Sequence, residues 1–424
     1  MLARYDTIIV GSGPGGASVA YQAARRGQRV LVLECGSAAP LRGTLGQMAG
    51  MAAIPGRGAF FHRDASLLVR GLTAGGTSTL NFATASAPPL ERFAALGVDL
   101  APALDACRAE LPIGQLPDEL VGPLARRIMQ AAQAAGLPWS KLDKMIRPAL
   151  CRTGCWRCVY GCPYGAKWSA RELLDQARLH GAHLVDRAPV TRVLLEGGRA
   201  VGVEFSQAGA TRSVRAGAVV LAAGGIGSPR LLHASGLGPR SVPFFSDPVV
   251  AVMGAVPDIE GGAEVPMAAG MALPEEGLSF ADLTLPRPMY QAFALQVGRL
   301  DRLLAHKRTL SIMVKIRDEA GGGIGPRWVD KTLQPADRAR FGRGVALARQ
   351  VLQTAGARHI FQSWHFAAHP GGGLAIGHGV DADLRTATPG LYVCDASVLP
   401  APWGLPPTLT LLALGKRLGG ALPH

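Results

Sequence analysis

Apolar and polar positions in the first part of the chain alternate between strand and helix patterns. Residues 7–10 form a short apolar run, residues 17–26 have the spacing of a helix, and residues 29–33 are apolar again. The letters GSGPGG occupy positions 11–16, between the first strand and the helix. This order predicts a strand–helix–strand unit with a glycine-rich turn, which is typical of dinucleotide-binding folds.

The glycine turn supplies the residues that such a site needs. Gly11 permits the tight turn, Gly13 lets the backbone approach a pyrophosphate, and Gly16 lets the helix pack closely on the strand. The phosphates would lie at the helix N-terminus, where unpaired N–H groups favour anions. Glu34 ends the second strand and would accept hydrogen bonds from a ribose diol. The sequence therefore predicts a dinucleotide site at this turn.

Later segments return to the strand pattern after a helical stretch. The expected elements are helices at 121–135, 166–180 and 339–355, and strands at 183–186, 190–196, 200–206, 214–215, 218–222, 249–256, 309–317 and 390–394. The strand at 218–222 ends in a second glycine turn that begins at Ala223 and Gly224, as in the second half of a dinucleotide fold.

These elements predict an α/β fold class with a discontinuous cofactor domain. A Rossmann-like domain of the two-dinucleotide type comprises residues 1–85, 183–238 and 372–424. Residues 86–182 are expected to form a helical cap lobe that carries a group of cysteines. Residues 239–371 are expected to form a substrate-binding domain of mixed sheet and helices.

Composition and charge indicate the class of protein, its expected location and the partners it is expected to lack. Among the 424 residues, 48% are hydrophobic and 17% are charged, which is typical of an ordered globular protein. No apolar run reaches the roughly 18 residues of a membrane span, and the first strand leaves no room for a signal peptide, so a cytoplasmic location is expected. The net charge of +14 comes from scattered basic residues, which indicates a solvated basic surface. No nucleic-acid motif is present, and any membrane contact is expected to be at most peripheral.

Four of the seven cysteines fall close together, at Cys151, Cys155, Cys158 and Cys162. The last three, followed by Pro163, match the C-x2-C-x3-C-P part of a ferredoxin run, which favours an iron–sulfur cluster. Structural zinc is an alternative because thiolates also suit that metal. Disulfides are disfavoured by the absence of an export signal. Thiols without a ligand are the remaining interpretation.

Five blocks along the chain resemble the glucose–methanol–choline (GMC) family of FAD-dependent oxidoreductases. They are the N-terminal glycine turn, GGTSTLN at 75–81, VVLAAGGIGSP at 219–229, HPGGG at 369–373, and the tail that runs from GLYVCDASVLP at 390–400 into GLPPTLTLLALGKR at 404–417. The blocks occur in the family order over the whole length. The chain is shorter than most members, which implies a trimmed cap and substrate lobe.

The resemblance implies FAD, held noncovalently because no histidine adjoins the GGTSTLN loop. It assigns the ADP half to Gly11, Gly13, Gly16, Glu34, Val190, Ala223 and Gly224, and the isoalloxazine, ribityl and pyrophosphate parts to Gly75, Gly76, Thr77, Asn81, Asp395, Ala396 and Pro407. An enzyme that uses only NAD is the alternative, but the second glycine turn and the tail block favour the larger FAD footprint.

His369 falls on the family's catalytic histidine, which takes the hydroxyl proton of an alcohol while hydride passes to the flavin. The family usually places His or Asn as a second partner in the tail, where this chain has Pro406, which has no donor. Three explanations stay open: His365 or another group replaces the partner, one histidine is enough, or the chemistry is not alcohol oxidation. A packed histidine beside Trp364 and Phe366 is a further interpretation of His365.

The resemblance therefore implies an FAD-dependent dehydrogenase that oxidises the CH–OH group of a small molecule. Some similar family members are flavin subunits of membrane-linked sugar or polyol dehydrogenases and carry an iron–sulfur cluster. By that analogy Cys151, Cys155, Cys158 and Cys162 would hold a 3Fe–4S or 4Fe–4S cluster that passes electrons to a protein or quinone acceptor. The alternatives are a flavoenzyme that acts on a C–C bond and a non-catalytic electron-transfer flavoprotein subunit.

Overall fold

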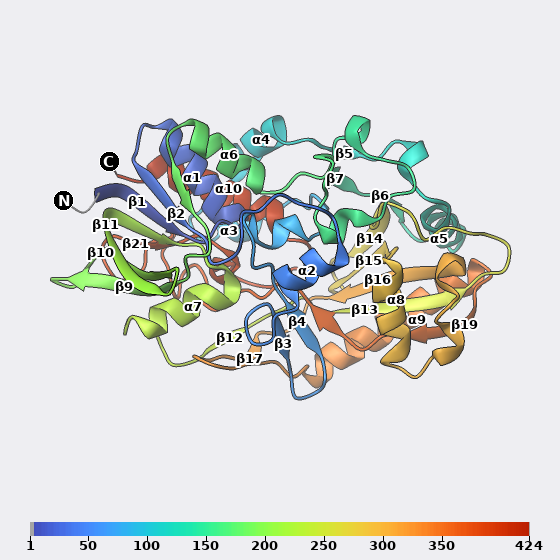
Figure 1. Cartoon of the computed structure of the whole chain (residues 1–424). Helices are drawn as coiled ribbons and strands as arrows, with labels where there is room; N and C mark the ends of the chain where they lie inside the picture. The colour runs from blue at the N-terminus through green and yellow to red at the C-terminus, as the bar shows by residue number, and fades with distance from the viewer. Residues whose placement is uncertain (1–3, 424) are drawn as a thin grey trace.

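A mixed sheet of seven strands, the first sheet, forms one half of the molecule (Figure 1). The structure is a computed structural model that describes residues 4–423. The strand order is β8-β2-β1-β11-β10-β9, with β21 paired to β11. The strands are β1 (Arg4–Val10), β2 (Val30–Leu33), β8 (His183–Val185), β9 (Val190–Glu196), β10 (Arg199–Gln207), β11 (Ala210–Leu221) and β21 (Leu391–Val393).

The parallel part of the first sheet brings three chain segments to one edge. Val10 at the end of β1 lies opposite Leu33 of β2 and Leu221 of β11. Leu221 in turn pairs with Val393 of β21. The turns that follow these strands therefore meet at the carboxyl edge, where ligands of open α/β sheets bind.

Helices cover both faces of the first sheet. Figure 1 shows α1 (Pro14–Arg25), α6 (Arg171–Leu179) and α10 (Thr408–Ala421) on one face and α7 (Gly224–Ala234) on the other. Helices α1 and α10 approach closely because of glycine: a Cβ on Gly415 would lie 2.5 Å from the carbonyl oxygen of Gly15. The final helix of the chain is thereby locked against the first helix.

A second sheet of nine strands forms the other half of the molecule. Its order is β3-β4-β20-β13-β16-β15-β14-β6, with β19 paired to β13. The strands are β3 (Ala59–Phe61), β4 (Leu67–Val69), β6 (Ser140–Lys141), β13 (Val249–Ala255), β14 (Ala269–Leu273), β15 (Leu278–Asp282), β16 (Thr309–Ile316), β19 (Arg358–Gln362) and β20 (Phe366–Ala367).

Apolar side chains on both faces bury the central strands of the second sheet. Val252 and Ile312 belong to the core under α5 (Pro123–Ala134) and α9 (Pro335–Thr354), whereas Ala251 and Met313 belong to the core that includes α8 (Arg287–Leu295). This double burial explains why β16 is fully buried and almost continuously apolar. A charged residue within such a strand is therefore unusual.

Smaller elements complete the described chain. The helices among them are α2 (Leu45–Ala52), α3 (Leu90–Ala94) and α4 (Ala101–Glu110), with the 3-10 helices η1 (Gly76–Thr79), η2 (Asp118–Leu120), η3 (Pro148–Leu150), η4 (Arg157–Tyr160), η5 (Leu300–Arg302), η6 (His306–Arg308) and η7 (Ala396–Val398). The strands are the pair β5 (Ile113–Gln115) and β7 (Asp143–Met145), and the small sheet β12 (Val242–Phe244), β17 (Gly321–Ile324) and β18 (Val329–Asp330).

The predicted α/β class with a Rossmann-like part and a mixed-sheet part is confirmed, with differences in detail. The segments expected at 214–215 and 218–222 are one strand, β11, because its first half pairs with β10 and its second half with β1. Strands β3 and β4 fall within the range assigned to the cofactor domain but join the second sheet through β20. The lobe expected to be helical also contains β5, β6 and β7. The three-part division of the chain stays a prediction.

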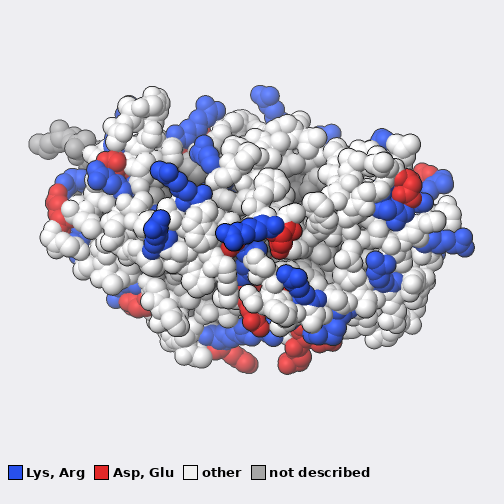
Figure 2. Space-filling model, turned by 90° about the horizontal axis from the view of Figure 1, so that it is seen from below, with Lys and Arg blue, Asp and Glu red and all other residues white. Residues whose placement is uncertain are grey.

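The distribution of charged side chains and the character of the helices relate to the predictions of a solvated basic surface and of at most peripheral membrane contact. Figure 2 shows Lys and Arg side chains spread over one face, separated by uncharged surface and by Asp and Glu. Between residues 4 and 423, every helix falls short of the length and apolar character needed to cross a membrane.

Candidate active site

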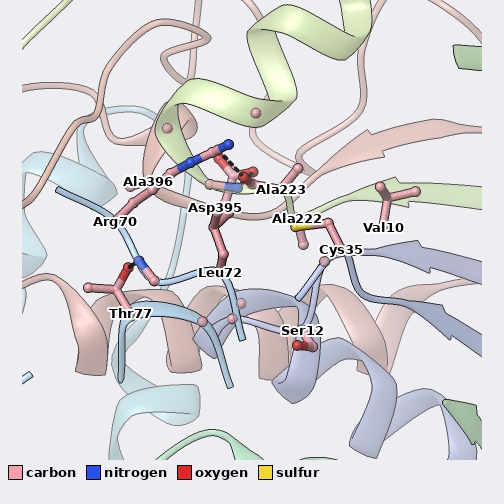
Figure 3. Close-up of a pocket in the computed structure, with 18 of the residues that line it drawn as sticks. Val10, Ser12, Cys35, Arg70, Leu72, Thr77, Ala222, Ala223, Asp395 and Ala396 are labelled. Carbon is pink, nitrogen blue, oxygen red and sulfur yellow. Dashed lines mark hydrogen bonds between the residues drawn. The ribbon is translucent and has the colours of Figure 1, made fainter. Parts of the chain in front are cut away.

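A cavity of about 450 Å³ lies at the carboxyl edge of the first sheet (Figure 3). Its walls come from the turns after β1, β2 and β11, from the GGTSTLN loop, and from the start of α10. The predicted cofactor residues that line it are Gly11, Gly13, Glu34, Gly76, Thr77, Asn81, Val190, Ala223, Gly224, Asp395, Ala396 and Pro407. Residues from five distant blocks of the sequence thus share one cavity.

The glycines of the cavity leave space that a side chain would fill. Gly11 has φ +98°, and a Cβ there would lie 2.3 Å from the carbonyl oxygen of Ala222. At Gly13 a Cβ would meet nothing within 4 Å, and Gly13 lines the cavity. A Cβ on Gly76 would lie 2.9 Å from the Cα of Gly13, so the two glycine loops touch. Backbone can therefore approach a ligand at the N-terminus of α1.

Two predicted glycines lie behind this wall instead of in it. A Cβ on Gly16 would lie 2.3 Å from the carbonyl oxygen of Gly11, which is the close helix–strand packing expected of the third glycine. Gly75 has φ +80° and donates its N–H to the hydroxyl of Ser12 at 3.2 Å. Both glycines shape the cavity without lining it.

Glu34 is 4% exposed and sits in the cavity wall. Its Oε2 accepts hydrogen bonds from the N–H of Ser12 at 3.0 Å and from its hydroxyl at 2.6 Å, while Oε1 accepts from the N–H of Gly36 at 2.7 Å. These three donors fix the carboxylate. Sequence reasoning missed Ser12, although its place inside the glycine turn was a usable signal.

Asp395 joins β21 to the N-terminus of α7. Its Oδ2 accepts a hydrogen bond from the N–H of Gly224 at 3.0 Å, and its Oδ1 accepts from the N–H of Ser397 at 2.8 Å. Burial raises the pKa of Asp395, and the hydrogen bonds from Ser228 and Ser397 oppose that rise. The tail block therefore holds the second glycine turn in place.

Asn81, which also lines the cavity, makes hydrogen bonds to three different segments of the chain. Its Nδ2 donates to the hydroxyl of Thr408 at 3.3 Å, at the start of α10. Its Oδ1 accepts from the N–H of Ala83 at 3.0 Å and from Nζ of Lys167 at 3.3 Å. The buried Lys167 also donates to the carbonyl oxygens that end η1, and so it positions the GGTSTLN loop from behind.

Arg57, Arg70 and Arg230 also line the cavity, and sequence reasoning missed all three. Arg70 donates to the carbonyl oxygens of Arg57 at 2.7 Å and Ala223 at 3.4 Å, and Figure 3 shows it reaching toward Ala223. One terminal nitrogen of Arg230 is buried without a partner, and burial lowers the pKa of Arg230 to about 10. These cations and the helix N-termini suit a diphosphate, so the residues fit the FAD that the glycine loops predict.

His369 lines the same cavity. Its Nδ1 lies 3.1 Å from Nζ of Lys315 and 4.0 Å from Oδ2 of Asp247. Burial and the Lys315 ammonium hold the pKa of His369 well below its usual range, so the ring is neutral near pH 7. Lys315 and Asp247 were missed, although a lysine inside the apolar strand β16 was a signal.

His365 lies apart from His369 in this structure. It does not line the cavity, and its Nε2 lies 3.2 Å from Oδ2 of Asp64. Its ring centroid is 6.2 Å from that of Phe341. Burial lowers the pKa of His365, and Asp64 opposes that shift. The structure thus brings only one of the two predicted catalytic histidines to the cavity.

The four clustered cysteines are free thiols and do not form a ligand set. Cys158 is a buried residue of η4, whereas Cys151, Cys155 and Cys162 are partly exposed. In the part of the chain that the structure describes, no three His, Cys, Asp or Glu side chains are grouped to hold a metal ion. The predicted cluster is therefore without structural support.

The cavity, its glycine loops and its cations fit FAD, and similarity to known proteins shows that the protein is an FAD-dependent oxidoreductase that acts on CH–OH donors. Two family models, both described as GMC oxidoreductase, match residues 5–251 and 325–415. The chain belongs to the GMC oxidoreductase family. It is 31% identical to an uncharacterized GMC-type oxidoreductase of Mycobacterium tuberculosis, over 97% of this chain and 74% of that protein.

Relatives with a stated activity are more distant. A long-chain-alcohol oxidase of Arabidopsis thaliana is 26% identical over 85% of this chain and 55% of that protein. The fold is similar to pyridoxine 4-oxidase from Mesorbium loti, with a TM-score of 0.72 and 20% identity over 98% of both chains. It is also similar to a formate oxidase variant from Aspergillus oryzae RIB40, with a TM-score of 0.75 and 16% identity over 98% of this chain and 97% of that one.

Proposed function

We propose that the protein oxidises an alcohol to the carbonyl compound and that His369 is the base. The observation that carries the proposal is the neutral His369 ring in the wall of the cavity that the glycine loops of the first sheet also line. A neutral imidazole can accept a hydroxyl proton near pH 7. When bound, FAD supplies the acceptor for the hydride of the alcohol carbon.

The proposed work of the chain is binding, orientation and proton removal. Glu34 would hold the ribose, and Gly13 with the nearby cations Arg70 and Arg230 would hold the pyrophosphate. The Nδ1 atom of His369 lies against Lys315, and when Nδ1 donates its proton to that contact, Nε2 is left with a lone pair that can accept the hydroxyl proton. Pro406 contributes no donor, so His369 is proposed as the only histidine in the reaction.

The electrons are proposed to leave for a protein or quinone acceptor. Alcohol oxidation itself needs no iron–sulfur cluster, because one flavin accepts both electrons. An iron–sulfur cluster held by Cys151, Cys155, Cys158 and Cys162, as their spacing predicts, would carry the electrons onward. That route stays a prediction.

Anaerobic mixing of the FAD-loaded protein with candidate alcohols tests the function. The printed activities of relatives suggest pyridoxine and a long-chain alcohol such as 1-dodecanol as first probes. Bleaching of the oxidised flavin by a probe alcohol, with release of the matching aldehyde, supports alcohol oxidation. Bleaching by a compound with an activated C–C bond and by no alcohol supports the C–C alternative instead.

A further inference from the structure

A network of buried charges lies directly behind His369. Its members are Lys315 at 2% exposure, Asp247 at 3%, Asp318 at 0% and Lys331 at 3%. None of the four lines the cofactor cavity. Buried charges are costly unless they are paired, so a network of this size is unusual at a wall that seals a cavity. The network reaches the cavity through His369.

The contact between Lys315 and His369 determines which ring nitrogen carries the proton. Lys315 belongs to β16, where it pairs in register with Val249 and Ser279 on the two neighbouring strands. Its Nζ lies 3.1 Å from Nδ1 of His369. A neutral imidazole has one N–H and one lone pair, so the partner of Nδ1 sets the state of Nε2.

The two charge states of Lys315 have opposite consequences for His369. An ammonium donates to Nδ1, which places the ring proton on Nε2 and leaves that atom unable to accept another. An amine accepts the hydrogen bond from Nδ1–H, which leaves a lone pair on Nε2. Only the second state lets Nε2 take a hydroxyl proton from the cavity.

Asp247 is held in a special conformation that aims its carboxylate at this contact. Its φ is +46°, a left-handed value that is costly for a residue with a side chain. Its N–H donates to Oδ1 of Asp318 at 2.8 Å, and Asp318 is paired with Lys331 at 2.8 Å. The Oδ2 of Asp247 then lies 4.0 Å from Nδ1 of His369. The pair formed by Asp318 and Lys331 thus holds Asp247 in place beside His369.

The charges favour Lys315 over the ring as the place for a proton. Burial lowers the pKa of Lys315 to about 8, and the Asp247 carboxylate opposes that shift. Burial also raises the pKa of Asp247 to about 7, against the effect of Lys315, so Asp247 is the ionised partner near pH 8. Burial and Lys315 push the pKa of His369 well below its usual range. A proton that reaches Nε2 therefore displaces the Nδ1 proton toward Lys315, where Asp247 stabilises the ammonium.

We propose that Lys315, backed by Asp247, is the positioning residue that sets the tautomer of His369 and receives its Nδ1 proton. The hydroxyl proton of the alcohol passes to Nε2, the Nδ1 proton passes to Nζ of Lys315, and the carbon gives its hydride to FAD. The alcohol thus becomes a carbonyl compound, the amine of Lys315 becomes an ammonium, and FAD, when bound, would accept the hydride. The inference rests on the proposed function.

The tail loop that carries Pro406 is fastened to the same network. The N–H of Gly404, two residues before Pro406, donates to Oδ1 of Asp247 at 3.2 Å. The carbonyl oxygen of Gly404 accepts from the hydroxyl of Ser279 at 2.9 Å. The tail loop is therefore fastened to Asp247, and the proton partner of His369 comes from β16 behind it.

The test reads the tautomer by 15N NMR of the histidine-labelled, FAD-loaded protein, with the His369 signals identified through His369→Gln. In the wild type, the ring proton is expected to move from Nε2 to Nδ1 as the pH rises through about 8, where Lys315 loses its charge. Asp247→Asn removes the carboxylate that stabilises the ammonium, so its transition should fall at lower pH. Lys315→Met should show no transition.

Lys144→Met is the matched control, because Lys144 is also buried but donates to the carbonyl oxygens of Pro266 and Met267 instead. It should keep the wild-type transition. A single His369 tautomer across the whole pH range in the wild type, or an unchanged transition in Lys315→Met, overturns the proposal. If Lys315→Met does not fold, Asp247→Asn still tests the proposal. A tautomer transition of His369 at the same pH as in the wild type would then overturn it.

The kinetic arm separates this inference from the proposed function. With a probe alcohol that bleaches the flavin, Lys315→Met should slow flavin reduction on the order of 10²-fold, with little change in KM. Failure of every probe alcohol contradicts the proposed function and leaves the NMR result standing. A fixed tautomer in a protein that does oxidise alcohols contradicts only the role of Lys315.

Discussion

The carboxylate of Glu34 accepts two hydrogen bonds from one residue, Ser12, at 3.0 Å from its N–H and 2.6 Å from its hydroxyl. Glu34 follows β2, and Ser12 lies in the glycine turn that follows β1. The contact therefore joins the carboxyl ends of β1 and β2 at the cavity. The carboxylate of Glu34, which is predicted to bind the ribose, is thereby held in place before FAD binds.

Glu34→Gln should weaken FAD binding. The amide has one acceptor atom where the carboxylate has two, and hydrogen bonds to charged groups contribute about 1.5–3 kcal/mol, so the Kd should rise roughly 10- to 100-fold. Titration of the apoprotein with FAD, followed by flavin fluorescence, measures the change. Glu196→Gln is the control, because that side chain pairs with Arg215 on an exposed strand, and its Kd should equal that of the wild type.

Gly13→Ala should separate folding from cofactor binding. Gly13 has φ −64° and ψ −178°, an extended conformation that alanine also adopts, and its Cβ would meet nothing within 4 Å, so the apoprotein should keep the wild-type Tm. The methyl group would enter the space proposed for the pyrophosphate, and overpacking of about 1–3 kcal/mol should raise the Kd for FAD roughly 10- to 100-fold. An unchanged Kd would show that the pyrophosphate lies elsewhere.

Gly11→Ala provides the contrast to the change at Gly13. Gly11 has φ +98°, and its Cβ would lie 2.3 Å from the carbonyl oxygen of Ala222. This variant should lower the Tm of the apoprotein itself, because the clash is with backbone. Equal melting temperatures for the two variants would contradict the packing described for the turn.

Arg70→Gln should weaken FAD binding in a salt-dependent way. If Arg70 faces the diphosphate, its loss removes a charge-assisted contact of about 1.5–3 kcal/mol, and the Kd should then respond less steeply to salt. Arg63→Gln, at a side chain that is 89% exposed and paired with Asp330, should leave both quantities unchanged. Matching salt dependence in Arg70→Gln and the wild type would remove Arg70 from the proposed phosphate site.

The cysteine prediction can be settled by metal analysis. A cluster held by Cys155, Cys158 and Cys162 requires iron and acid-labile sulfide in anaerobically purified protein, and Cys158→Ser should lose both while FAD stays bound. Stoichiometric zinc without sulfide would support the zinc interpretation instead. Protein with FAD and neither metal would support the interpretation that these cysteines are thiols without a ligand.

The cofactor half of the molecule follows closely from local sequence pattern. Gly11, Gly13 and Glu34 lie within one strand–helix–strand unit, so the spacing along the chain already determines their place at the cavity. Asp395 was found through its family block and indeed lines the same wall.

The charged residues behind the cavity could not be placed from local pattern. Lys315 meets His369 only because β16 pairs with β13, which pairs with β20 just before His369. Such pairings depend on the fold of the whole second sheet. The arginines of the cavity were missed for the same reason, since Arg70 and Arg230 come from separate segments and share no motif.

The central claim, that His369 is the base of an alcohol-oxidising flavoenzyme, is tested most directly by anaerobic stopped-flow of wild type and His369→Gln with the same probe alcohol. A positioned general base contributes roughly 10²–10⁴-fold, so flavin reduction in His369→Gln should slow by that factor while the spectrum of bound FAD stays unchanged. His365→Gln, which alters a side chain paired with Asp64 outside the cavity, should reduce its flavin at nearly the wild-type rate. Reduction of His369→Gln at the wild-type rate would contradict the account.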